Sequence, residues 1–208
     1  EDNKFPGYGL YGCKLFSLTL PKNITTIGAY ALVGNINLSE VTFFEGLTSI
    51  DYRAFSNCDA LTSIELPTGL KTIGYYSFDD CNNLLSVSLP DGLELINNYA
   101  FQSCNKLANI NFPEGLTSIG YQAFNGCHAL TSAILPPTVM TIGDGAFRNC
   151  SSLTEIRIPC SIRSLGDYAF YDCPKLNAVY SYTVEPINIG QNTFTKDGNN
   201  FIGTLHAP

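Results

Sequence analysis

Six cysteines recur at every 23rd position of this chain, and the thiol is the side chain here with the most varied chemistry. They are Cys58, Cys81, Cys104, Cys127, Cys150 and Cys173. A thiolate can bind zinc, act as a nucleophile or form a disulfide bond. Zinc sites, however, group their cysteine ligands in pairs about two to four residues apart, and no pair in this chain has that spacing. The even spacing therefore argues against a metal site.

Disulfide bonds within this column are disfavoured by direction rather than by distance. Neighbouring strands lie about 4.8 Å apart, within the reach of a disulfide, but equivalent side chains of stacked repeats point the same way. We expect each thiol to be a small buried group that donates a weak hydrogen bond to a backbone carbonyl. Asn35 occupies the same column, which supports a structural role because asparagine satisfies turn backbone. Cys13 and Cys160 lie outside the column and far apart, so eight free thiols are predicted.

Other patterns give no support for catalysis or for phosphate and nucleic-acid binding. The two histidines, His128 and His206, fall in no nucleophile–base arrangement, and the glycines do not follow the spacing of a phosphate-binding loop. Eleven Lys and Arg are spread thinly against 18 Asp and Glu, whereas nucleic-acid binding needs a clustered basic face. No apolar run approaches the ~18 residues that span a membrane. We predict no enzyme activity, metal, cofactor, nucleic-acid partner or membrane insertion.

The elements that position these residues are predicted to be those of a solenoid, because a fixed period of about 20–50 residues is typical of stacked repeats. Each repeat carries the pattern L-x-x-I-x-L, and its last three residues alternate as in a half-buried strand. The copies start at Leu15, Leu38, Leu61, Leu84, Leu107, Leu130, Leu153 and Leu176. Stacked copies form a parallel sheet, and a proline after most of the strands ends them.

The second half of each repeat predicts a turn and a core position on the opposite side. One column contains Gly28, Asp51, Gly74, Asn97, Gly120, Gly143 and Gly166. These residue types best tolerate positive φ, so we expect left-handed backbone there. An Ala-Phe pair follows in most repeats, such as Ala54-Phe55, and predicts a single helical turn with the phenylalanine in the core.

The combined pattern L-P-x-G-L-x-x-I-G-x-x-A-F-x-x-C-x-x-L-x-x-I-x-L resembles the BspA-like leucine-rich repeats, also called the Treponema pallidum type, over residues 15–180. The resemblance implies a β-rich α/β fold: a right-handed, curved solenoid with a concave parallel sheet and short turns or single helical turns on its convex side. It also implies export to a bacterial or protist surface and adhesion to host proteins or other cells. No shared catalytic residues come with the family.

We expect one leucine-rich repeat domain over residues 1–208, and a monomer. Its predicted parts are an N-terminal flank at 1–14, about eight 23-residue repeats at 15–180, and a C-terminal capping segment at 181–208. The tail resembles the capping segment of such proteins from gut anaerobes, and we expect it to be truncated.

Candidate ligand-contacting residues are the strand side chains that point away from the core. They are Ser63, Glu65, Ser86, Ser88, Asn109, Asn111, Ser132, Ile134, Glu155, Arg157 and Tyr180. Most are small and polar, and the C-terminal end is richer in the Tyr and Arg that dominate protein hot spots. Ala133-Ile134 interrupts the alternation, with Ile134 either exposed or shifted by a bulge. We predict a binding patch at Ile134, Glu155, Arg157 and Tyr180; the alternative is that Glu155 and Arg157 are solvated strand residues.

Tyrosines precede the Ala-Phe pairs on the other side of each repeat. They are Tyr30, Tyr52, Tyr75, Tyr76, Tyr99, Tyr121 and Tyr168. Tyrosine suits interfaces and carbohydrate stacking, but we favour a structural role at a half-buried surface.

Three functions fit these observations. The favoured hypothesis is an extracellular or cell-surface recognition and adhesion module that binds a protein or a glycan. A spacer array that carries another domain of a surface protein is the second. An intracellular scaffold or delivered effector is the third, and free thiols are compatible with it because reducing compartments keep cysteines unpaired.

Overall fold

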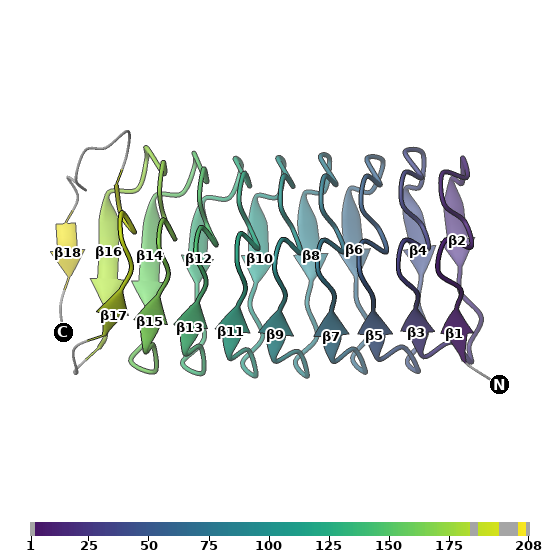
Figure 1. The fold of residues 1–208 in the computed structure, drawn as a ribbon, viewed down its shortest axis with the longest axis horizontal. Coiled ribbons are helices and arrows are strands. Elements are labelled where there is room, and N and C mark those ends of the chain that lie inside the picture. The colour runs from purple at the N-terminus through teal and green to yellow at the C-terminus, as the bar shows by residue number, and fades with distance from the viewer. Residues whose placement is uncertain (1–2, 184–186, 196–203, 207–208) are drawn as a thin grey trace.

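The computed structural model describes residues 3–183, 187–195 and 204–206, the last three by backbone alone. It is a parallel β-solenoid of about eight rungs, a rung being one turn of about 23 residues (Figure 1). The predicted stack of parallel strands is confirmed. Of the predicted cap at 181–208, residues 184–186, 196–203 and 207–208 lie outside the described residues.

One side of the solenoid is a continuous nine-stranded parallel sheet of short strands. Its strands are β1 (Lys4–Phe5), β3 (Thr26–Ile27), β5 (Ser49–Ile50), β7 (Thr72–Ile73), β9 (Leu95–Ile96), β11 (Ser118–Ile119), β13 (Thr141–Ile142), β15 (Ser164–Leu165) and β17 (Asn188–Ile189). From β3 to β15 the second residue of each strand is buried, while the first is half-buried or exposed.

The other side carries the L-x-x-I-x-L strands and is divided into three parallel sheets. The first holds β2 (Ser17–Thr19) and β4 (Glu40–Thr42), and the second holds β6 (Ser63–Glu65), β8 (Ser86–Ser88) and β10 (Asn109–Asn111). The third holds β12 (Ser132–Ile134), β14 (Glu155–Ile158), β16 (Ala178–Ser181) and β18 (Thr204–His206). We call this side the strand face. The single sheet expected here is therefore interrupted twice.

Each interruption follows a strand whose next core residue is phenylalanine. This column reads Leu20, Phe43, Leu66, Leu89, Phe112, Leu135 and Ile158, and the ladder breaks after β4 and after β10. The Phe112 ring packs edge-on against Phe124 and Phe147, at 5.6 and 6.4 Å between centroids. Phe147 belongs to the next rung, so the ring extends along the solenoid axis. We infer that this bulk holds neighbouring strands too far apart to pair.

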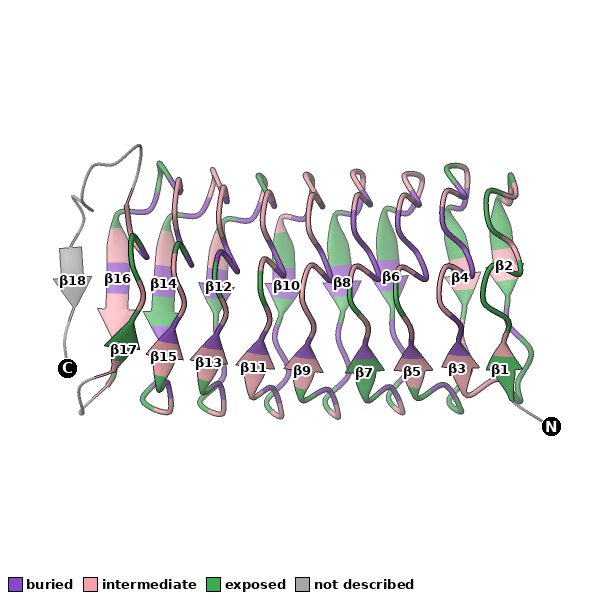
Figure 2. Cartoon of the chain, viewed as in Figure 1, coloured by how far each residue is buried: buried purple, intermediate pink, exposed green. Residues whose placement is uncertain are grey.

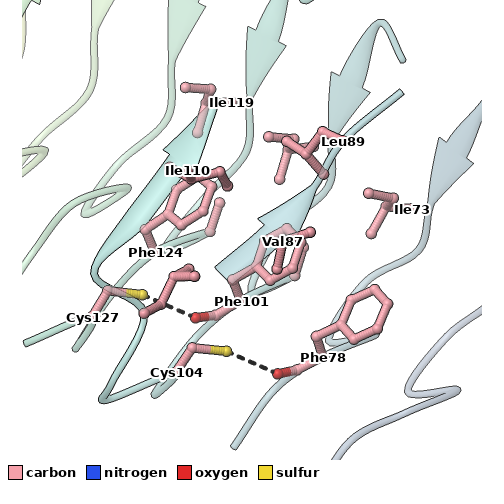
Figure 3. Close-up of a cluster of buried hydrophobic side chains, with 14 of the residues drawn as sticks. Ile73, Phe78, Val87, Leu89, Phe101, Cys104, Ile110, Ile119, Phe124 and Cys127 are labelled. Atoms are coloured by element: carbon pink, nitrogen blue, oxygen red, sulfur yellow. Dashed lines mark hydrogen bonds between the residues drawn. The ribbon is translucent and has the colours of Figure 1, made fainter. Parts of the chain in front are cut away.

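The core between the two sides contains a stack of phenylalanine rings, one from each rung. Phe55, Phe78, Phe101, Phe124, Phe147 and Phe170 are fully or almost fully buried. Their rings are nearly parallel, and successive centroids are 5.2–5.4 Å apart. Figure 3 shows three of them beside the strand residues Val87, Leu89 and Ile110. The predicted role of these phenylalanines as core residues is confirmed.

The expected helical turn before each phenylalanine is wrong, and the described residues contain no helix. In this segment alternate N–H groups donate to the next rung: those of Arg53, Phe55 and Asn57 reach Tyr75, Ser77 and Asp79 at 2.8–2.9 Å. An α-helix would need those donors for bonds four residues back within the chain. The rungs are therefore joined at the turns as well as at the strands.

The expected left-handed column was also misplaced. Positive φ occurs two residues later, at positions such as Tyr76 (57°) and Tyr99 (60°), and again just before the cysteine. The glycines of this column are explained by close approach instead: a Cβ on Gly74 would lie 2.7 Å from the backbone of Asp51, and one on Gly166 would lie 2.3 Å from the Asp144 nitrogen. These glycines let one rung pack directly on the backbone of the preceding rung.

Candidate binding surfaces

The cysteine column is structural, as its hydrogen bonds show. Each of the six thiols is buried, with its Sγ 3.2–3.3 Å from a backbone carbonyl of the preceding rung. Figure 3 shows two of these bonds, from Cys104 to Phe78 and from Cys127 to Phe101. The predicted thiol–carbonyl hydrogen bond is confirmed.

Burial also suppresses the reactivity of these thiols. It raises the pKa of the Cys58 thiol to about 12 and raises the pKa of Cys81 and Cys104 well above the ordinary value. The thiolate is the form that attacks carbonyls and binds metals, so these groups are inert at neutral pH. All eight cysteines are unpaired. Within the described residues no group of three His, Cys, Asp or Glu side chains could hold a metal ion.

Asn35 occupies the cysteine column and, like the thiols, donates side-chain hydrogen bonds to backbone carbonyls. Its Nδ2 donates to the carbonyls of Leu10 and Leu32, both at 2.8 Å. Cys13 heads this column, contrary to the expectation that it lies outside: its N–H donates to Leu10 just as the N–H of Asn35 donates to Leu32. Lys4 pairs with Thr26, so the first two rungs are 22 rather than 23 residues apart. The 23-residue period therefore does not align Cys13 with Asn35 in the sequence.

The predicted contact residues lie in two columns along the strand face. On β6, β8 and β10 the alternation is exposed, buried, exposed (Figure 2). One set pairs Ser63 with Ser86 and Ser86 with Asn109, and the other pairs Glu65 with Ser88 and Ser88 with Asn111. A hollow of about 480 Å³ lies over β6 and β8, and residues of both columns line it.

A second hollow, of about 400 Å³, lies at the interruption between β10 and β12. Asn109 and Asn111 line it from β10, and Ser132 and Ile134 line it from β12. The Ile134 side chain is 61% exposed, and β12 pairs regularly with β14, so Ile134 is exposed rather than displaced by a bulge. Phe112, Leu135 and Pro136 also line the hollow, so its walls mix polar and apolar groups, and Ile134 adds an exposed apolar side chain.

The C-terminal part of the strand face brings together the predicted patch. Ile134 pairs with Arg157, and Arg157 pairs with Tyr180, so the three occupy one column on consecutive rungs. The Arg157 guanidinium lies over the Tyr180 ring at 5.4 Å and contacts Glu155, with Nε 3.4 Å from Oε1. The ion pair and the ring contact orient the Arg157 side chain toward Glu155 and Tyr180. Whether these residues bind a ligand stays a prediction.

Comparison with known proteins identifies the repeat. The sequence model of the BspA type leucine-rich repeat region matches residues 3–131 and 71–200, with six copies. The chain belongs to the BspA-type leucine-rich repeat family. Among solved structures, the T. pallidum leucine-rich repeat protein is 31% identical with a TM-score of 0.69, and the match covers 87% of this chain and 76% of that one.

Two further structures share the fold of this BspA-type chain. A leucine-rich repeat protein from Eubacterium ventriosum is 26% identical with a TM-score of 0.71, over 76% of this chain and 42% of that one. The pneumococcal vaccine antigen PcpA is 23% identical with a TM-score of 0.53, over 88% of this chain and 54% of that one. No curated protein sequence matches significantly.

The nine-stranded side of this BspA-type solenoid contains hollows that the sequence did not point to. One of about 510 Å³ has Gly120, Gly143, Gly166 and Gly190 among its lining residues. It adjoins a smaller one around Gly145, and Tyr121, Asp144 and Asp167 line both. The signal that could have found the smaller hollow is a glycine in a column that otherwise carries large side chains.

One buried carboxylate also lies on this side. Asp79 is 4% exposed, and its Oδ1 accepts no hydrogen bond within the described part of the chain. Burial and the neighbouring Asp80 raise the pKa of Asp79 to about 7, although Arg53 and a hydrogen bond from Ser56 oppose the rise. Asp79 lies within the turn that precedes Cys81 and lines none of the hollows described above, so we assign it no part in binding.

Proposed function

We propose that this chain is a non-enzymatic binding module of a cell-surface protein, and that it presents its strand face to a protein or glycan ligand. The family supports a binding role, since stacked repeats make long exposed surfaces. The PcpA structure is described as a vaccine antigen, which favours an extracellular location for this chain as well. Among the described residues no helix has the length and apolar character needed to cross a membrane.

The observation that carries the proposal is the column Ile134, Arg157 and Tyr180 beside the hollow at β10 and β12. Binding energy at protein surfaces concentrates in a few Arg and aromatic residues surrounded by polar groups. Here an exposed isoleucine lines a hollow of about 400 Å³ with mixed polar and apolar walls. A guanidinium that lies over a tyrosine ring stands beside that isoleucine on the next rung. The rest of the strand face has mostly small hydroxyl and amide side chains, which would act as complementary surface rather than as anchors.

The test is a binding screen of the 1–208 chain, as a monomer, against arrays of extracellular-matrix proteins and glycans. For any ligand found, Arg157→Ala with Tyr180→Ala should weaken binding at least about tenfold, since a hot spot is worth about 2 kcal/mol or more. The matched control is Ser63→Ala with Ser86→Ala, on the same face but outside the patch, and it should leave binding intact.

Two outcomes would contradict the proposal. If the Arg157 and Tyr180 variant binds like the unmodified chain while the serine variant does not, the ligand lies over β6 and β8 instead. If no array member binds at all, a spacer array in a larger surface protein becomes the better explanation.

A further inference from the structure

A column of left-handed residues on the nine-stranded side carries large side chains, and a glycine interrupts it. The column contains Tyr8, Tyr30, Arg53, Tyr76, Tyr99, Gln122, Gly145, Tyr168 and Asn192, all with φ of 50–61°. Successive tyrosines stack, as Tyr76 and Tyr99 do at 4.1 Å between centroids. Gly145 contributes no side chain between Gln122 and Tyr168, and the Gln122 side chain lies 3.1 Å from where a Cβ of residue 145 would be.

That place is a hollow of about 270 Å³, which we call the Gly145 slot. Tyr121 and Tyr168 line it, and each is more than a third exposed. Asp144 and Asp167 line it too, so two tyrosines and two carboxylates border one small space. The slot lies on the turns that follow β11, β13 and β15, and no residue of the predicted patch on the strand face borders it.

Four rungs earlier, the same position shows what such a place accommodates. Arg53 occupies the column there, with its guanidinium 4.5 Å from the centre of the Tyr76 ring and its Nε donating to the Tyr52 hydroxyl at 3.2 Å. Tyr76 follows Arg53 in the column, on the next rung, and Tyr168 follows Gly145 in the same way. A guanidinium on a tyrosine face is a favourable cation–π pair. By analogy with Arg53 and Tyr76, Tyr168 is placed to offer its ring to a guanidinium in the Gly145 slot.

The charges in the slot also favour a cation. Asp144 and Asp167 stand where Tyr52 and Tyr75 flank Arg53, one residue before the column. Their Oδ1 atoms accept the backbone N–H groups of Asp167 and Gln191, at 2.8 and 2.6 Å, which fixes both carboxylates. Within the described residues neither carboxylate forms an ion pair.

Arg148 is the one cation of the slot lining, and two carboxylates exceed its charge. Its guanidinium lies over the Tyr171 ring at 5.2 Å. Its buried Nε donates no hydrogen bond to the described part of the chain. Arg148 is therefore held by an aromatic contact rather than by the carboxylates, and the carboxylates are left to attract a second cation.

We propose that the Gly145 slot binds the guanidinium group of an arginine side chain presented by a protein partner. The aromatic faces of Tyr121 and Tyr168 pack against the planar group, and Asp144 and Asp167 accept its N–H donors. This adds a second contact surface to the binding module, on the side of the solenoid away from the strand face. It also specifies a partner chemistry, which the strand face does not.

The probe is N-acetyl-arginine amide, titrated into the ¹⁵N-labelled 1–208 chain and followed by amide chemical shifts. We expect saturable shifts at Gly145 and its neighbours. N-acetyl-citrulline amide has nearly the same shape without the charge and should bind at least about tenfold more weakly. Equal binding of the two probes, or shifts at Gly145 with methyl glucoside but not with the arginine probe, would overturn the proposal.

Two variants test the slot itself. Gly145→Arg should fill the slot with its own side chain and abolish the shifts. Arg53 adopts a φ of 53° in the same column, and the new Cβ would lie 3.1 Å from Gln122 Cγ, so the flexible Gln122 side chain has to move slightly. Asp144→Asn with Asp167→Asn should weaken binding at least about tenfold by removing both charges. The backbone contacts survive this change, because Asn98 already accepts the Tyr121 N–H at 2.9 Å in the same column.

A control separates this proposal from the strand-face proposal. Arg157→Ala should leave the arginine-probe shifts unchanged, since Arg157 lies on the strand face. If the probe binds equally well to the Asp144 and Asp167 double variant, the slot is not an arginine site, whatever the result for the strand face.

Discussion

The two sides of the solenoid repeat with the same period but respond differently to departures from it. On the nine-stranded side, Asp51 and Asn97 stand in the glycine column and the alanine column nearby admits Ser77, yet the ladder continues through all nine strands. On the strand face, phenylalanine replaces an aliphatic residue at Phe43 and Phe112, and the ladder breaks after each.

The difference follows from how many backbone bonds hold each side. The turns next to the nine-stranded sheet donate alternate N–H groups to the following rung, as Arg53, Phe55 and Asn57 do. Rung spacing there is fixed by strands and turns together. The strand face relies on ladders of three or four residues, so a change in side-chain volume is enough to open it. Surface variety therefore arises on the two sides by different means: by strand separation on one, and by a missing side chain on the other.

The largest effect we predict concerns the cost of the buried Asp79 carboxyl on the nine-stranded side. Asp79 has a pKa of about 7 in the folded chain and about 3.9 when unfolded, so the folded state binds the extra proton between these values. Asp79 does not lower the unfolding free energy below about pH 4, where it is protonated in both states. As the pH rises to 7, Asp79 lowers the unfolding free energy by up to about 4 kcal/mol. Asp79→Asn should remove this decline, measured by urea unfolding from pH 4 to 8.

The exposed Asp91→Asn serves as the control for this series and should keep the decline. If the stabilities of the unmodified chain and of Asp79→Asn change in parallel from pH 4 to 7, the Asp79 carboxyl is not held in its neutral form.

The regular parts of the fold could be predicted because they depend on patterns that the sequence states directly. Alternation in L-x-x-I-x-L predicts the strands, and the recurrence of Phe55 and Cys58 one period apart predicts a shared core. The left-handed residues could not be found this way, since tyrosines at positive φ contradict local preference. Tyr76 and Tyr99 accept that conformation because their N–H groups bond to the next rung and their rings stack.

For the candidate surfaces, the sequence predicted which side chains point outward but not where the hollows lie. Alternation shows that Ser63 and Arg157 point outward, but it treats leucine and phenylalanine alike, so it gives no sign of the break after Phe112. The Gly145 slot was missed for a related reason. A glycine at position 145 suggests only a backbone conformation that favours glycine. The space that it leaves between large neighbouring side chains becomes visible only when the rungs are aligned.

A smaller effect concerns the break on the strand face. Phe112 extends toward the rung that carries Ala133, where most rungs have Ile or Val. Ala133→Ile should overpack the Phe112 ring and destabilise the chain by about 1–3 kcal/mol, and Phe112→Leu should leave a void at a cost of about 1–2 kcal/mol. Together they restore the ordinary pair, so the double variant should recover most of the loss.

Hydrogen exchange tells whether the double variant also closes the ladder. The amides of Ser132 and Ile134 should become protected to the level of the paired strands β8 and β14, and the hollow between β10 and β12 should close. Additive destabilisation without new protection would mean that Phe112 does not cause the break.

The smallest effect concerns the cysteines that join both sides to one core. Cys104→Ala removes a weak hydrogen bond to the Phe78 carbonyl and leaves a small void, so we expect a loss of about 1 kcal/mol in unfolding free energy. The same change at the exposed Cys160 should cost nothing measurable. Thiol labelling of the native chain gives the matching kinetic result: Cys160 should react first, and Cys104 only as fast as its rung opens. Rapid labelling of Cys104 in the folded chain would mean that the rungs separate far more readily than their shared backbone bonds imply.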